Sequence, residues 1–142
     1  DKPKSGNIVT EDGEVLGKHN GLFNYTIGQR KGLGIAYKHP LYVIGFNGER
    51  NEVIVGPNDR LFTNRMICKF YNFLDDTIHK ELKAEGKIRY AANPSPCTAR
   101  ILDDDTMEVI FEEPQRAITP GQSVAFYNGT QLLGGAVIDR VC

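Results

Sequence analysis

Apolar and polar residues alternate in short stretches along the chain, and Gly, Pro, Asn or Asp separate the stretches. A period of two is typical of a β-strand with one buried face. In the first half the pattern predicts two hairpins, with turns at 11–14 and 47–51. The predicted strands are 7–10, 15–16, 42–46 and 52–56.

The second half predicts six further strands and a polar connection over 75–85 that includes a helical turn. Asn128-Gly129 is a strong signal for the turn of the last hairpin. Six short strands in so few residues avoid exposed edges best when the sheet closes, so we expect a barrel. These strands are 66–73, 86–91, 97–102, 107–112, 122–127 and 131–138.

One short helix is expected between the two hairpins of the first half. Thr26 and Gln29 have the spacing of a capping box, which predicts a helix over 27–31 that ends at the following glycines. Polar segments at 57–59 and 63–64 predict a boundary near Phe62 between two small β-rich domains, 1–62 and 63–142. A chain of 142 residues with 40% hydrophobic and 25% charged residues suits such a folded pair.

Charge is unevenly distributed, although the formal net charge is only −1. Residues 17–40 carry Lys18, Arg30, Lys31 and Lys38 and no acid, whereas residues 101–114 carry six acids and no base. A basic face is the feature expected for a polyanionic partner. The acidic stretch is interpreted as a solvated hairpin edge that discourages aggregation.

Motifs for catalysis, metal binding or membrane insertion are weak. Cys68, Cys97 and Cys142 are widely spaced, which is typical neither of a disulfide framework nor of a zinc site, and three free thiols suit a reducing cytoplasm. No apolar run is long enough to span a membrane. We therefore expect no catalytic residue and no metal site, and a binding module rather than an enzyme.

Three segments could bind a ligand, and each also has a purely structural interpretation. The glycine-rich loop 17–35 could hold a phosphate group or could simply close a small sheet. Arg89 could pair with phosphate and Tyr90 could stack on a base, or they could be a surface charge and a core ring. Gln122 could read a nucleotide edge, although a plain turn residue is the simpler interpretation.

The order of several motifs closely resembles the tRNA-specific 2-thiouridylases. The motifs are Gly17-Lys18-His19-Asn20-Gly21, Tyr25-Thr26-Ile27-Gly28-Gln29-Arg30-Lys31-Gly32-Leu33-Gly34-Ile35, Ile88-Arg89-Tyr90, Ala117-Ile118-Thr119-Pro120-Gly121-Gln122 and Leu133-Gly134-Gly135-Ala136. The resemblance implies a mainly β chain: a small SH3-like β roll, then a six-stranded antiparallel β-barrel similar to domain two of translation elongation factors.

The resemblance also implies a function. Members of the family replace the 2-oxygen of the wobble uridine of tRNA with sulfur, using ATP with Mg and a persulfide. Their pyrophosphate loop and catalytic cysteines lie in an N-terminal domain, and neither is present here. This chain is therefore expected to be the central and C-terminal part of a longer cytoplasmic enzyme, to hold no cofactor and to be inactive alone.

By the same resemblance, Arg89, Tyr90 and Gln122 are expected to bind tRNA. His19, Gln29, Arg30 and Lys31 are expected to face RNA or the absent active site. The expected partners are tRNA, the N-terminal catalytic domain and a sulfur-carrier protein. The alternative is a structural or protein-interaction module that braces the catalytic domain or docks the sulfur carrier without touching RNA.

Overall fold

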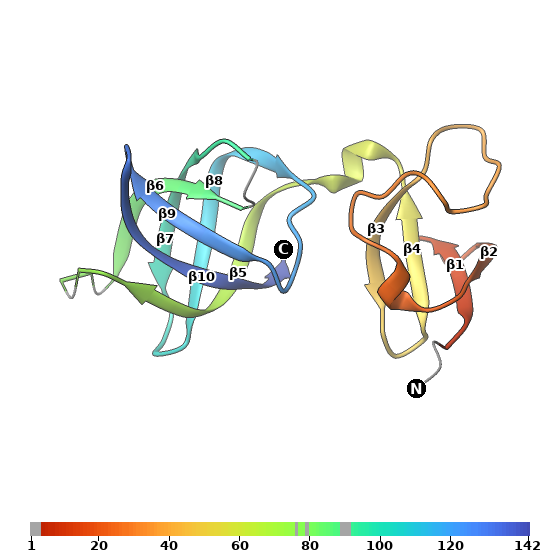
Figure 1. Ribbon diagram of the computed structural model, residues 1–142, viewed down its shortest axis with the longest axis horizontal. Coiled ribbons are helices and arrows are strands. Elements are labelled where there is room, and N and C mark those ends of the chain that lie inside the picture. Colours follow the sequence, from red (N-terminus) through yellow and green to blue (C-terminus); the bar gives the residue numbers. More distant parts are fainter. Residues whose placement is uncertain (1–3, 76, 79, 89–91) are drawn as a thin grey trace. The chain divides into compact units, whose positions relative to one another are not determined.

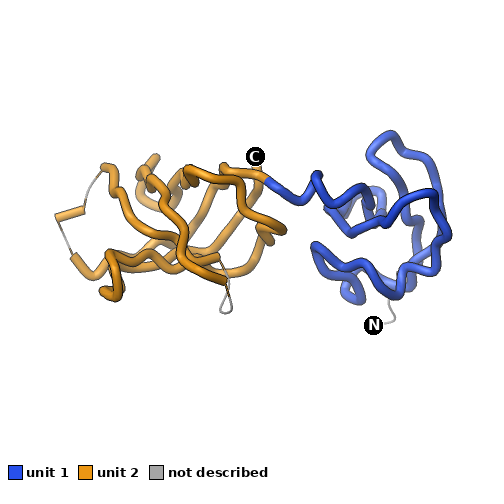
Figure 2. Tube along the Cα trace, turned by 90° about the horizontal axis from the view of Figure 1, so that it is seen from above, with its two compact units in different colours: residues 1–62 blue, residues 63–142 orange. Residues whose placement is uncertain are grey.

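The protein is described here by a computed structural model that covers residues 4–75, 77–78, 80–88 and 92–142. It consists of two compact units, residues 1–62 and residues 63–142 (Figure 2). The strands of unit 1 are β1 (Gly6–Thr10), β2 (Val15–His19), β3 (Tyr42–Asn47) and β4 (Glu52–Gly56). The strands of unit 2 are β5 (Phe62–Phe73), β6 (Glu81–Lys87), β7 (Ser95–Ile101), β8 (Thr106–Arg116), β9 (Ser123–Asn128) and β10 (Gln131–Val141).

Unit 1 is a four-stranded sheet in the order β2-β1-β4-β3 (Figure 1). The two predicted hairpins are present, with β1 antiparallel to β2 and β3 antiparallel to β4. They are joined through a parallel pairing of β1 with β4, in which Ile8 lies opposite Val53. Both residues are fully buried, together with Val43 and Val55, so the apolar stretches of both hairpins build one core.

The helix predicted over 27–31 is wrong. That segment forms turns, and the helical residues in the described part of unit 1 belong to two short 3-10 helices, η1 (Leu22–Asn24) and η2 (Asn58–Leu61). Gly28 has φ +91°, which excludes a right-handed helix at this point. The backbone of the turn instead pairs with β3, because Gly28 N donates to Val43 O at 2.8 Å and Val43 N donates to Gln29 O at 2.9 Å.

Unit 2 is a closed barrel of six strands in the order β10-β5-β8-β7-β6-β9 (Figure 1). The prediction of a mainly β chain with a six-stranded antiparallel barrel is confirmed. The inward side chains of alternate strand positions form the core, in which Phe111, Phe126, Met66, Met107 and Ile138 are all nearly or fully buried. The predicted last turn is present, with Asn128 opposite Gln131 and with Gly129 and Thr130 as its two central residues.

One strand of the barrel differs from its prediction. Strand β6 covers Glu81–Lys87, most of which was predicted as a polar connection over 75–85. The segment Glu81-Leu82-Lys83-Ala84-Glu85 consists of good helix formers. Pairing with β7 on one side and β9 on the other overrides this preference, and Leu82 and Ala84 pack against the barrel core.

Two of the three cysteines are buried in the barrel. Burial raises the pKa of both the Cys68 and the Cys97 thiols to about 12, whereas Cys142 is exposed. Thiols with so high a pKa are protonated at neutral pH and are poor nucleophiles. Over the described ranges the fold contains no helix of the length and hydrophobicity needed to cross a bilayer.

Candidate nucleic-acid interface

The basic segment between β2 and β3 is a loop held against its own sheet. Gln29 N donates to Thr26 O at 3.0 Å, which closes a turn with Gly28 in the left-handed region. The Gln29 side chain stabilises this turn, because its Oε1 accepts from Thr26 N at 3.0 Å and its Nε2 donates to Lys31 O at 2.9 Å. Gln29 therefore shapes the loop with both ends of its amide group.

His19 fixes the start of the same loop. Only 3% of its surface is exposed. Its Nδ1 accepts from Gly21 N at 3.0 Å, so the ring proton lies on Nε2, which donates to Asn51 O at 2.8 Å. Asn51 in turn donates through Nδ2 to Ser5 O at 2.9 Å. The imidazole thus ties the loop to the β3–β4 hairpin, and the neighbouring Tyr25 ring contacts it edge-on.

Replacing His19 with Phe is expected to destabilise unit 1 by about 3 kcal/mol, because two backbone groups lose their partners where water is largely excluded. Urea unfolding measures the change. His39→Phe is the matched control, since His39 is exposed, and it should change stability by less than about 0.5 kcal/mol. Equal effects of the two variants would contradict a structural role for His19.

A small depression of about 150 Å³ is lined by Tyr37, His39 and Leu41 of this loop together with the acidic Glu11, Asp12 and Glu14. Two larger open depressions lie along the loop itself. The first has a volume of about 590 Å³, and the second of about 780 Å³. Neither lining contains an acidic residue. The first is lined by Lys18, His19, Asn20, Asn24, Tyr25, Gln29, Gly32 and Leu33. The second is lined by Arg30, residues 32–36, Tyr37, Lys38, His39, Pro40 and Leu41.

The structure separates the four loop residues singled out from the sequence. His19 and Gln29 line the first depression, Arg30 lines the second, and Lys31 is exposed but belongs to neither. The second depression also contains a pair of rings, since Tyr37 and His39 contact edge-on with centroids 4.9 Å apart. Proteins bind single-stranded nucleic acid with this combination of side chains, because cations contact the phosphates and exposed aromatic rings stack on the bases.

In the barrel, Gln122 lies immediately before β9. Its backbone N donates to Thr119 O at 3.2 Å across a turn in which Gly121 has φ +90°. Its backbone O accepts from Ile138 N at 2.8 Å. The side chain is exposed, and no hydrogen bond to its amide is recorded among the described residues. The backbone of Gln122 is therefore structural, while its amide group is available for a ligand.

Arg89 and Tyr90 lie outside the described residues. The preceding residues are described: Ile88 is buried, and Lys87 pairs with Ala125 on β9. Within the parts of the chain that the structure covers, no three His, Cys, Asp or Glu side chains come together in a group that could hold a metal ion.

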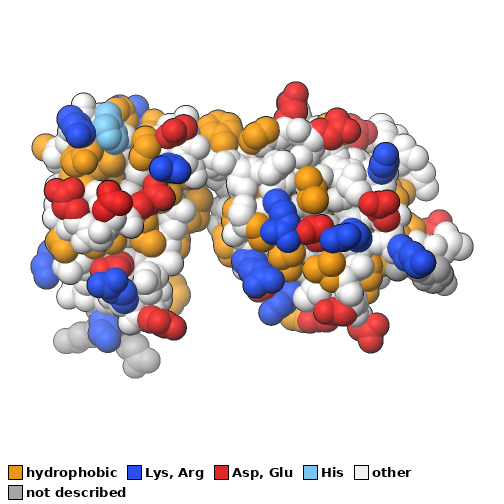
Figure 3. Space-filling view, turned by 180° about the vertical axis from the view of Figure 1, so that it is seen from behind, with side chains coloured by type: hydrophobic (Ala, Val, Ile, Leu, Met, Phe, Trp, Pro, Cys, Tyr) orange, Lys and Arg blue, Asp and Glu red, His pale blue; other side chains and the backbone are white. Residues whose placement is uncertain are grey.

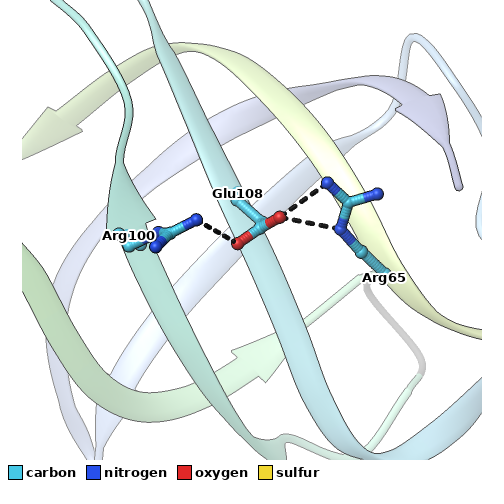
Figure 4. A network of polar contacts seen from close by, with 3 residues as sticks. All are labelled: Arg65, Arg100 and Glu108. Carbon is cyan, nitrogen blue, oxygen red and sulfur yellow. Dashed lines mark hydrogen bonds and ion pairs between the residues drawn. The ribbon is translucent and has the colours of Figure 1, made fainter.

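Sequence reasoning missed a charged network on the barrel (Figure 4). Glu108 was assigned to a solvated acidic edge, but it is only 8% exposed and pairs with Arg65 and Arg100. The hydrogen bond that Arg65 donates to the Glu108 carboxylate raises the pKa of Arg65. A turn over 103–106 predicts Val109 opposite Arg100, whereas the observed register is shifted by one residue and places Glu108 opposite Arg100.

Comparison with known proteins matches both units to families. The family described as a tRNA methyl transferase PRC-barrel domain matches residues 2–57, and the family described as an aminomethyltransferase β-barrel domain matches residues 63–138. The tRNA-specific 2-thiouridylase MnmA of Clostridium botulinum (strain Alaska E43 / Type E3) is 47% identical over 139 residues, which are 97% of this chain and 38% of the relative. The chain belongs to the tRNA-specific 2-thiouridylase family.

Other members of the 2-thiouridylase family give the same picture. The MnmA of Clostridioides difficile (strain 630) is 45% identical over 138 residues, which are 96% of this chain and 38% of the relative. That of Geotalea uraniireducens (strain Rf4) is 47% identical over 136 residues, which are 96% of this chain and 36% of the relative. The chain thus spans less than two fifths of the length of these 2-thiouridylases, and it corresponds to their central and C-terminal part.

Proposed function

We propose that this chain is the tRNA-binding and positioning part of an enzyme that places sulfur at the 2-position of the wobble uridine. The observation that carries the proposal is the loop 17–41, which includes the last residues of β2 and whose two larger depressions are lined by cations, aromatic rings and amide groups without an acidic side chain. The names of the relatives support tRNA as the molecule that is modified.

In this proposal the chain positions tRNA and does not perform the chemistry. Contacts to phosphate fix the register of a nucleic acid on a protein. A base that the protein already holds in the reactive orientation also reacts faster than a freely moving one. ATP with Mg and the catalytic thiols belong to the N-terminal domain of the whole protein, which acts in the cytoplasm and receives sulfur from a carrier protein. Buried Cys68 and Cys97 are unsuited to that role.

On the barrel, the proposal assigns tRNA contacts to Arg89, Tyr90 and Gln122. The exposed amide of Gln122, immediately before β9, supports this assignment. The chain enters the Ile88–Tyr90 segment beside the same strand, because Lys87 pairs with Ala125. Arginine can grip a phosphate with two parallel hydrogen bonds, and a glutamine amide can both donate to and accept from a base.

Titration of labelled tRNA by fluorescence anisotropy at several salt concentrations tests the proposal. Arg89→Ala is expected to weaken binding about tenfold and to reduce the salt slope by about 0.9, as for one lost phosphate contact. Gln122→Ala should weaken binding without changing the slope, because an amide carries no charge.

Lys80→Ala is the control, since Lys80 is exposed and lies just before β6, at the opposite end of that strand from Lys87. It should leave the affinity within about twofold. If the unmodified chain binds tRNA at low salt no better than a neutral control protein does, the proposal is wrong.

A second candidate function is docking of the catalytic domain. Phe23 in η1 is fully exposed, and phenylalanine is enriched in the buried centres of protein–protein interfaces. Phe23→Ser would then weaken association with the separately produced N-terminal domain and leave tRNA binding unchanged.

A further inference from the structure

We propose that the outer face of the barrel formed by Arg65, Arg100 and Arg140 binds the phosphodiester backbone of RNA. This inference rests on the proposed function, and it assigns a second contact surface besides the loop 17–41 and Gln122. The space-filling view shows Lys and Arg side chains gathered around acidic groups on one face of unit 2 (Figure 3).

Strand alternation places the network on the outside of the barrel. Met66 and Cys68 on β5 belong to the core, so Arg65 between Asn64 and Met66 points outward. On β7, Ala99 belongs to the core and Arg100 is exposed. Strand β8 lies between these two strands in the barrel order.

Glu108 on β8 holds both guanidinium groups in place (Figure 4). Arg65 Nε donates to Oε2 at 2.7 Å, and Arg65 Nη2 lies 2.6 Å from the same oxygen. Arg100 Nη2 donates to Oε1 at 3.1 Å. The Glu108 side chain is only 10% exposed, whereas those of Arg65 and Arg100 are 45% and 58% exposed. The carboxylate is thus covered, while the remaining N–H donors of both arginines can reach a ligand.

Arg140 extends this face onto the next strand. It lies opposite Ile67 on β5, so it is a diagonal neighbour of Arg65 across the β10–β5 pair. It takes part in none of the ion pairs recorded among the described residues, whereas the nearby Lys69 is neutralised by Asp139 at 3.5 Å. Glu108 and Glu81, which lies opposite Arg100 on β6, share this face with the three arginines, so these five side chains together carry a net charge of +1.

The arrangement suits an extended chain of phosphates better than a single small anion. Strands β5 and β7 are two strand spacings apart, roughly 10 Å, so Arg65 and Arg100 can serve neighbouring phosphates. Guanidinium groups bind phosphate bidentately. Since Glu108 already restrains two of them, less side-chain entropy is lost on binding.

This face is continuous with the barrel residue proposed to contact tRNA. Gln122 pairs through its backbone with Ile138, and the register of β10 shifts between Ile138 and Arg140. Gln122 therefore lies beside the end of β10 that carries Arg140. An RNA strand held at Gln122 can continue over Arg140 toward Arg65.

Anisotropy titration of the 142-residue chain with labelled tRNA tests the inference. The Arg100→Gln/Arg140→Gln double variant is expected to bind at least about tenfold more weakly, with a salt slope lower by about 1.8, as for two lost phosphate contacts. Arg140→Gln alone provides a second test that leaves the Glu108 network intact. Arg50→Gln is the control, because Arg50 is exposed in unit 1, and it should change affinity by less than about twofold.

The outcomes separate the two proposals. If the unmodified chain binds tRNA and the double variant binds as the control does, this inference is wrong and the proposed function stands. If the unmodified chain does not bind tRNA, both are wrong. If poly-glutamate competes with tRNA as well as unlabelled tRNA does, the face binds acidic chains in general, and the assignment to RNA is overturned.

Discussion

Replacing Gly134 with alanine is expected to destabilise the barrel by about 3 kcal/mol or more. A Cβ at this position would overlap the backbone oxygen of Asn72 and would lie 2.7 Å from Phe73 Cδ1 and 2.9 Å from Phe73 Cα. Gly134 pairs with Phe73 across β10 and β5. The nearest obstacles belong to the backbone of a paired strand, which cannot rotate away as a side chain can.

Urea unfolding followed by a barrel probe and a unit 1 probe measures this effect. Gly45→Ala in β3 is the matched strand control, because its Cβ would meet no atom closer than 4.0 Å. We expect the transition of the barrel to move to lower urea for Gly134→Ala and the transition of unit 1 to stay in place. A loss below about 1 kcal/mol would show that β5 and β10 can separate at little cost.

The second large effect is a loss of barrel stability in alkali. Burial raises the pKa of the Cys68 and Cys97 thiols to about 12, from 9.0. Between these values the unfolded chain releases two protons that the folded barrel keeps. The free energy of unfolding of the barrel therefore keeps its full value below a pH of about 9. It falls as the pH rises toward about 12, by about 1.4 kcal/mol per pH unit for each thiol.

Urea unfolding of the barrel at pH 8, 9, 10 and 11 tests this. The Cys68→Ala/Cys97→Ala variant is the control: it starts less stable because two side chains are shortened, but its stability should fall less steeply with pH. Alkylation gives an independent measurement, since only exposed Cys142 should react in the folded state at pH 8. Parallel pH profiles for the two proteins would contradict the prediction.

Hairpins could be predicted from the sequence because their signals are local. The Asn128-Gly129 turn and the alternation around it define β9 and β10 without any other part of the chain. The parallel contact of β1 with β4 has no such signal, because its partners, such as Ile8 and Val53, are far apart in the sequence. The predicted helix failed because the capping spacing of Thr26 and Gln29 also suits a turn, and the φ of Gly28 selects the turn.

The candidate site was predictable to a similar extent. The cations of the loop 17–41 follow directly from composition, whereas the roles of His19 and Gln29 as anchors depend on backbone partners that no spacing indicates. Arg65 meets Glu108 from 43 residues away. An acidic residue in an acidic stretch gives no indication of such a partner, and so the network required the three-dimensional structure.

The place of β1 between β2 and β4 has a consequence for the order of assembly. While the polypeptide emerges from the ribosome, β1 and β2 can meet early, but the other neighbour of β1 is not made until residue 56 has been synthesised. The loop 17–41 connects the two hairpins, and it is pinned at one end by Asn51 and at the other by Val43. The newborn chain therefore fixes the conformation of this loop only in the last step of closing the small sheet.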